Sequence, residues 1–184
     1  KMVVIGGAIS IILYLTVIFA GFLAPYNPYK SFKKHFFHPP TQVHFTDEDG
    51  LTWPYVYATE SVDWAEYEVI KDKKYPIKLF HRGQEYELLG LFKTDLHLFG
   101  VDEPAHLFLL GSDNYGRDLF TRILFGGRVS MFIGFVAIFI TTIIGLIVGG
   151  IAGYYVGWVD NILMRFAEVI MSIPSFYLLL ALAA

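Results

Sequence analysis

Residues 129 to 159 carry no charged side chain, and this apolar run constrains the fold more than any other feature of the sequence. Val129–Ala152 is long enough to cross a bilayer as one helix, because about 20 helical residues span its hydrocarbon core. Two further apolar runs, Met2–Ala24 and the stretch from Ile162 onward, are also candidate spans. We therefore expect an α-helical polytopic membrane protein with spans at residues 1–24, 129–152 and 162–184, the last two joined by a short cytoplasmic turn at 153–161.

The composition agrees with this class and excludes others. The chain is 55% hydrophobic, which is more apolar than an ordinary soluble domain. A net charge of −3 argues against nucleic acid as a partner, and the absence of cysteine excludes disulfides and thiolate metal sites. A cleaved signal peptide is the alternative for the first run, but its apolar core would be only about 7–15 residues long. Lys1 and the apolar end of the sequence suggest that both ends are cut from a longer protein.

Residues 25–109 form a different kind of segment, polar and aromatic, which contains all six histidines. Alternating residues predict a β-hairpin over Tyr75–Phe92 that turns at Arg82-Gly83. Trp53–Ala58 and Ala105–Leu110 are further candidate strands, and Ala65–Ile70 reads as either a strand or a helical turn. The segment is predicted to be a small α+β insert, outside the hydrocarbon, between the first two spans.

Residues 110–128 read as a turn followed by a short amphipathic helix. Asp113 is the expected N-cap, with Asp118 in the early turns, and Gly126-Gly127 is the expected end. An apolar face opposite charged residues favours a helix that lies along the membrane interface. A core helix of the soluble segment is the alternative.

The later spans contain small and charged residues at regular spacing. Gly145, Gly149 and Gly153 share one helix face, where small residues let a neighbouring helix pack closely; their frequency alone is the simpler explanation. Arg165 and Glu168 are spaced to pair, either in a translocation path or between subunits, or as an ion pair that reaches water. Pro174 predicts a kink.

No motif for nucleotide binding, acyl transfer or zinc hydrolysis occurs in the sequence, so no catalytic residue, cofactor or metal is predicted. His35, His38 and His44 lack a carboxylate at a useful spacing and are interpreted as solvated loop residues rather than metal ligands. Asp113, Asn114 and Asp118 do not follow the calcium-loop pattern, so they are assigned to capping and ion pairing.

Two stretches resemble a known family. LGSDNYGRDLFTRILFGGRVS (110–130) and GGIAGYYVGWVDNILMRFAEVIMSIPSFYLLLALA resemble permease subunits of peptide/nickel-type ABC transporters, the dipeptide and oligopeptide kind. The residues that match the first motif are Gly111, Asp113, Gly116, Arg117, Asp118, Arg122, Gly126 and Arg128. Those that match the later pattern are Gly153, Tyr154, Asp160, Arg165, Glu168, Pro174 and Ser175. The family's ATPase-docking loop has no counterpart in this sequence, and the 25–109 insert is larger than in many dipeptide permeases.

The resemblance implies the N-terminal part of a type I ABC importer permease core. It also implies a second permease subunit, two ATP-binding subunits, an extracytoplasmic solute-binding protein and an inner-membrane location with the insert outside. Lys and Arg counts near the spans lean toward the opposite topology, although the positive-inside rule weakens for long loops. We thus expect a permease that imports peptides or similar solutes by alternating access. The alternatives are a proton-coupled secondary transporter that uses Glu168 and a membrane-anchored binding module that uses the insert.

Overall fold

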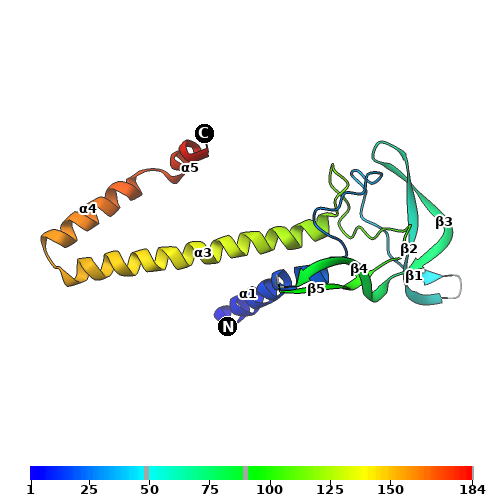
Figure 1. Ribbon diagram of the computed structural model, residues 1–184, viewed down its shortest axis with the longest axis horizontal. Helices are drawn as coiled ribbons and strands as arrows, with labels where there is room; N and C mark the ends of the chain where they lie inside the picture. Colours follow the sequence, from blue (N-terminus) through cyan, green and yellow to red (C-terminus); the bar gives the residue numbers. More distant parts are fainter. Residues whose placement is uncertain (48–49, 89–90, 184) are drawn as a thin grey trace. The chain divides into compact units, whose positions relative to one another are not determined.

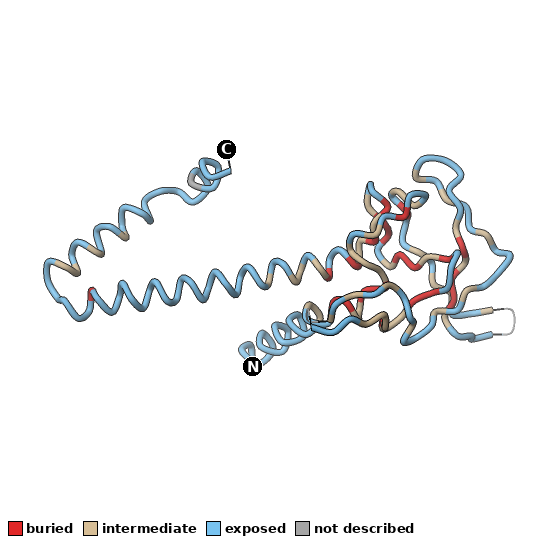
Figure 2. Tube along the Cα trace, viewed as in Figure 1, coloured by how far each residue is buried: buried red, intermediate tan, exposed pale blue. Residues whose placement is uncertain are grey.

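The computed structural model describes residues 1–47, 50–88 and 91–183, and the chain divides into two compact units, 1–131 and 132–184. Figure 1 traces the order of the elements, which is two helices, five strands and three helices. Among the described residues, every strand belongs to the first unit. Figure 2 shows that buried residues concentrate in that unit, whereas the helices at either end of the chain are exposed along most of their length.

The first apolar run forms two helices rather than one. Helix α1 (Met2–Ile18) is followed by the short α2 (Ala20–Leu23), with the break at Phe19, whose φ and ψ are −90° and 19°. The backbone becomes extended at Ala24, as expected for a residue that precedes a proline. Ala20 and Ala24 are fully buried, and they pack with Leu124. Their small side chains let α2 approach the segment that contains Leu124.

The described part of the insert contains strands and no helix, so the expected α+β class is wrong for it. Strands β1 (His44–Asp47), β2 (Gly50–Asp63) and β3 (Glu66–Pro76) form an antiparallel sheet in the order β1-β2-β3. Strands β4 (Lys78–Leu88) and β5 (Phe92–Gly100) form a second, two-stranded antiparallel sheet. The strand expected at Trp53–Ala58 lies within β2, and Ala65–Ile70 falls mostly in β3.

Two expectations about the strands are wrong. Arg82-Gly83 is not a turn, because β4 continues through it and the register shifts between Arg82 and Tyr86. A Cβ on Gly83 would lie 2.8 Å from the His97 ring, so this glycine marks a close approach within a strand. Ala105–Leu110 is an irregular loop rather than a strand. Ala105, Leu107 and Phe108 in this loop are buried all the same, and Ala105 and Leu107 pack against Val56 and Ala58 of β2.

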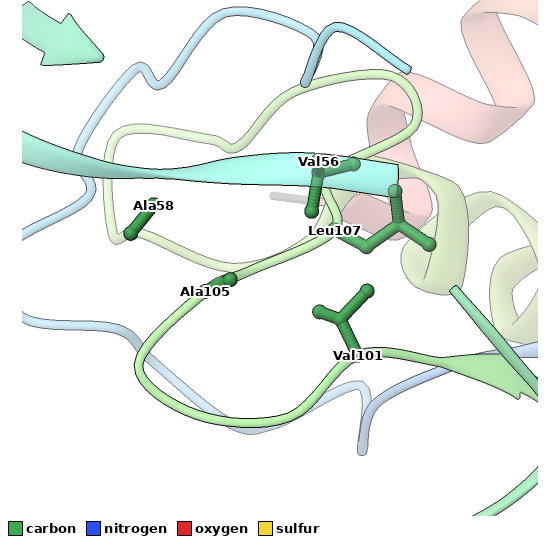
Figure 3. Packing of buried hydrophobic residues seen from close by; sticks show 5 residues of the cluster. All are labelled: Val56, Ala58, Val101, Ala105 and Leu107. Atoms are coloured by element: carbon green, nitrogen blue, oxygen red, sulfur yellow. The ribbon is translucent and has the colours of Figure 1, made fainter. Parts of the chain in front are cut away.

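The main core of the first unit lies between β2 and this loop. Val56 and Ala58 point from β2 toward Val101, Ala105 and Leu107 (Figure 3). All five are at most 8% exposed. This small core holds β2 and the chain after β5 together, and so fixes where residues 101–118 begin their path toward the next helix.

Helix α3 (Leu119–Tyr154) runs without a break through Gly126-Gly127, so the expected end of a short helix at these glycines is wrong. Neither glycine has a positive φ. Helix α4 (Trp158–Ser172) and helix α5 (Ser175–Ala183) follow, and the helix is interrupted at Ile173-Pro174, where a kink was expected. The boundary between the two compact units, after residue 131, lies within α3. The sequence had predicted segment boundaries at residues 110 and 129 instead.

By length and composition, α3 is the one described helix that could cross a membrane by itself. The bent pair α4 and α5 would make a second span if it crosses as one. Helix α1 is apolar but has only 17 residues. The three expected spans therefore correspond to one long helix, one broken pair and the α1–α2 pair.

Candidate functional site

Residues 111–128, called the junction below, lead from the insert into the first turns of α3. Asp118, not Asp113, caps this helix. Its Oδ2 accepts hydrogen bonds from the Thr121 amide at 2.8 Å and the Thr121 hydroxyl at 2.6 Å. A carboxylate there satisfies a free amide and complements the helix dipole. Thr121 was expected on the polar face of an amphipathic helix, but it is fully buried and takes part in the cap.

Asp113 organises the turn that precedes the helix. Its Oδ1 accepts from the amides of Tyr115 and Arg117 at 2.8 and 2.9 Å. Its Oδ2 accepts from Arg117 Nε at 2.9 Å and from Arg122 Nη1 at 2.5 Å. Desolvation disfavours the charged form, but these four donors outweigh it and lower the pKa of Asp113. The expected salt bridge with Arg117 is thus present, with Arg122 as a second partner.

The turn of the junction is bound to the loop that follows α2. The amides of Phe32 and Phe37 donate to the carbonyls of Gly116 and Asp113, at 2.9 and 3.0 Å. In return, Ser112 donates its amide to the His38 carbonyl at 2.9 Å, and its hydroxyl accepts from the His38 amide at 2.8 Å. The loop after α2 and the turn of the junction therefore satisfy each other's backbone hydrogen-bonding groups, although more than 70 residues separate them in the sequence.

Two glycines permit this close approach. Gly116 has a φ of +71°, and a Cβ there would lie 2.3 Å from the Phe32 carbonyl oxygen. Gly111 has a φ of +82°, and its Cβ would lie 2.5 Å from the His38 carbonyl oxygen. A side chain at either position would both strain the backbone and separate the segments.

A cluster of aromatic rings lies under the same loop. The centroid of the His35 ring is 4.7 Å from that of His106 and 5.3 Å from that of His38, and all three rings pack on Phe108. His38 is only 3% exposed, so the prediction of solvated loop histidines is wrong for it. His38 packs on Tyr67 and Phe108, which are distant in sequence, and nothing local to His38 signals its burial.

Burial makes these imidazoles poor bases. Desolvation, followed by the neighbouring imidazoles His106 and His38, lowers the pKa of His35 to about 4. Desolvation also lowers the pKa of His38 and of His106. The His35 Nδ1 atom is buried with no hydrogen-bond partner among the described residues. The cluster has no metal-binding geometry: within the described ranges, no group of three His, Cys, Asp or Glu side chains is placed to hold an ion.

Asp118 is itself buried, at 3% exposure, and desolvation raises the pKa of its carboxyl. Its Oδ1 has no hydrogen-bond partner in the part of the chain that the structure describes. Nearby, Tyr26 holds the loop before the junction by accepting the Leu107 amide at 2.8 Å. The junction therefore combines one ionised, well-paired carboxylate with one buried capping carboxylate.

The remaining predicted residues do not join this cluster. Arg128 lines a cavity of about 510 Å³ with Tyr29 and Phe125, and a Cβ on Gly126 would meet no atom within 4 Å. Arg165 and Glu168 form the expected ion pair at 2.8 Å on an exposed face of α4, with side chains 82% and 59% exposed. Three glycines of α3 were expected to pack against a neighbouring helix. A Cβ added to any of them would meet no atom within 4 Å, and they are Gly145, Gly149 and Gly153.

Comparisons with known proteins agree with the resemblance seen in the motifs. Residues 1–40 match a family model described as the N-terminal TM domain of oligopeptide transport permease C. The chain is 41% identical over 81 residues to the glutathione transport system permease protein GsiD of Pectobacterium atrosepticum, which covers 44% of this chain and 27% of that protein. It is 47% identical over 79 residues to the dipeptide transport system permease protein DppC of Bacillus subtilis, or 43% of this chain and 24% of that protein.

The chain thus spans about a quarter of the length of the curated relatives that it matches. No solved structure matches it significantly. The family model covers α1, α2 and the start of the loop that binds the junction. The chain is therefore similar, over part of its length, to permease proteins named for oligopeptide, glutathione and dipeptide transport.

Proposed function

We propose that this chain is part of a permease subunit of an ABC importer that moves peptides or similar small solutes across the inner membrane. The observation that carries the proposal is the sequence identity of 41–47% to permeases named for glutathione and dipeptide transport. No nucleotide-binding motif occurs in this sequence, and we propose that ATP is hydrolysed in separate subunits. These relatives are named as permeases of transport systems, and this does not favour the two alternatives, a proton-coupled transporter or a stand-alone binding module.

The junction gives this proposal a mechanical basis. Alternating access requires that membrane helices move as connected bodies rather than one by one. Leu124 in the first turns of α3 packs on Ala20 and Ala24, and the junction is hydrogen-bonded to the loop after α2. The ends of two apolar segments are therefore tied together beside the insert, and we propose that they move as one piece during transport.

The partners follow from the same proposal. A second permease subunit would complete the pathway, two ATP-binding subunits would drive it, and an extracytoplasmic solute-binding protein would deliver the solute. Gly145, Gly149 and Gly153, which form an open small-residue face on α3, would pack against a neighbouring helix of the complex. We also propose that the ion pair of Arg165 and Glu168 makes polar contacts in the translocation pathway or with the other permease subunit. The kink at Pro174 would lie in the same region.

The topology can be tested with single cysteines, because this sequence has none. The insert is proposed to be extracytoplasmic, and Ser61 in β2 is exposed and suited to labelling. Gly157, in the predicted cytoplasmic turn, has a φ of +105°, so Val156, which is 82% exposed, is the better probe position. A membrane-impermeant maleimide should label Ser61→Cys in intact cells and Val156→Cys only after lysis. The reverse pattern would contradict the assignment.

The function can be tested on the full-length complex with its ATP-binding subunits and binding protein in proteoliposomes. Peptide loaded on the binding protein should stimulate ATP hydrolysis and uptake, and both should vanish with an ATPase-inactive partner. Gly149→Leu should reduce uptake through lost helix packing, whereas the matched Val148→Leu should not. Uptake that persists without ATP hydrolysis but collapses with an uncoupler would instead indicate a secondary transporter. Full activity of Gly149→Leu would argue against the packing role.

A further inference from the structure

The sheet formed by β4 and β5 lies against the first apolar helices and leaves an apolar groove between them. The groove has a volume of about 690 Å³. Its walls include Ile12, Leu15 and Phe19 on the helix side and Leu88, Phe92 and Leu96 on the strand side. Since Ile12 precedes Leu23 by three helical turns, the groove follows the helices for roughly 16 Å from their C-terminal end.

One end of this arrangement is fixed by close contacts at α2. A Cβ on Gly21 would lie 2.4 Å from the Tyr86 ring, so the strand touches the helix backbone there. The His97 ring lies between the carbonyl oxygens of Ala24 and Gln84, with its nitrogens 2.5 and 2.9 Å away. The sheet is therefore anchored to the end of the helix, and its strands extend from this anchor beside α1.

The two strands are amphipathic in the manner of a sheet with one apolar face. Residues that alternate along β4 and β5, such as Tyr86, Leu88 and Phe92, line the groove. The residues between them are charged, and Glu87 pairs in register with Lys93. The apolar face is thus turned toward the helices and the charged face away from them.

Two large apolar side chains are exposed at the start of β5. Leu91 is 76% exposed and Phe92 is 66% exposed, between the charged pair Glu87 and Lys93. Large apolar side chains exposed together mark a surface that contacts a membrane or a partner. Lipid is the better fit, because the other wall of the same groove belongs to the segment matched by a family model for a transmembrane domain. The side chains of α1 are themselves exposed, as they would be in hydrocarbon, with Met2 and Val3 at 88%.

We propose that the ends of β4 and β5 form a second membrane contact, with Leu91 and Phe92 inserted at the headgroup boundary and lipid acyl chains filling the groove beside α1. The inference rests on the proposed function, because a permease subunit in the inner membrane would have the segment of α1 in the bilayer. Glu87 and Lys93 would mark the level at which the strands leave the apolar layer. The insert would then be held at a fixed tilt on the bilayer rather than extended away from it.

The test uses the full-length permease in liposomes, with one cysteine at a time labelled by an environment-sensitive fluorophore. Leu91→Cys is the test site, Ile9→Cys in α1 is the membrane reference, and Val62→Cys is the matched control. Val62 is an apolar residue, 60% exposed, near the end of the other hairpin, β2–β3. Quenching is measured with lipids that carry a nitroxide near the headgroup and with aqueous iodide.

The proposal expects nitroxide lipid to quench Leu91 several-fold more strongly than Val62, and iodide to quench Val62 far more strongly than Leu91. Iodide quenching of Leu91 equal to that of Val62, with Ile9 in lipid, would overturn the proposal and leave the membrane placement of α1 intact. Protection of Leu91 from both quenchers would show protein, not lipid, in the groove, and would also overturn it. Failure of lipid to quench Ile9 would remove both the inference and the proposed placement of α1.

Discussion

Replacing Asp113 by asparagine isolates the charge that holds the junction together. An asparagine side chain can still accept the amides of Tyr115 and Arg117 through its carbonyl oxygen, so the turn is preserved. The attraction to Arg117 Nε at 2.9 Å and Arg122 Nη1 at 2.5 Å is lost. The carboxylate is only 13% exposed, whereas the guanidinium side chains are 27% and 41% exposed, so solvent screens part of the interaction.

The magnitude follows from this partial burial. A hydrogen bond to a charged group contributes about 1.5–3 kcal/mol. Solvent screens the partly exposed guanidinium groups, so we take the two hydrogen bonds together to contribute about as much as one unscreened hydrogen bond to a charged group. Asp113→Asn should therefore cost about 1.5–3 kcal/mol of local stability. Each 1.4 kcal/mol is tenfold in an equilibrium constant, so local opening should become roughly 10- to 150-fold more frequent.

Hydrogen exchange measured by mass spectrometry on the full-length protein in detergent is the suitable assay. The amides of Phe32, Phe37 and Ser112, which cross between the two segments, should lose protection together. Asp102→Asn is the matched control, because the pair Lys78–Asp102 is about half exposed on both sides. Unchanged protection in Asp113→Asn, or an equal loss in the control, would refute the claim that this buried charge holds the junction.

Two further predictions concern the same region. Because the pKa of His35 is lowered to about 4 from 6.5, the folded state binds fewer protons than the unfolded state, so stability that is full above about pH 6.5 should be lost as the pH falls toward 4. Thermal unfolding at pH 7 and pH 5 should show this, and His35→Gln should reduce the difference; an equal loss in both proteins would contradict it. Gly116→Ala should destabilise the junction by at least about 1–3 kcal/mol through its positive φ and the contact with Phe32, measured by the same hydrogen exchange. Gly126→Ala, in a helix with open space, should be neutral or stabilising by up to about 1 kcal/mol, and equal effects of the two substitutions would argue against close approach as the cause.

Two of the wrong expectations concern glycines that were taken as signals of a helix end or a turn. Gly126-Gly127 was expected to end a helix, but a glycine costs only about 1 kcal/mol in a helix interior and α3 continues past both. Gly83 was expected in a turn, but its missing side chain makes room for His97 from the neighbouring strand. Only the fold shows whether a glycine is required by a positive φ, as at Gly116, by a close neighbour, as at Gly83, or by neither, as at Gly126.

The sequence by itself determined the features that depend on nearest neighbours along the chain. The apolar runs, the helix break at Pro174, the strand around Trp53–Ala58 and the i, i+4 pair of Asp113 with Arg117 are all local, and the structure contains each of them. The motif in the junction also pointed to the peptide permease relatives. Patterns of hydropathy and short-range spacing are sufficient for such features, because the interacting groups are fixed relative to one another by the helix or strand itself.

Only the tertiary structure decided the features that join distant segments. It buried His38 against Phe108 and paired the junction with the loop after α2. It also placed the ends of β4 and β5 beside α1, where an apolar groove remains. Burial and close approach depend on groups more than 50 residues apart, and no periodicity within either segment encodes which other segment will cover it.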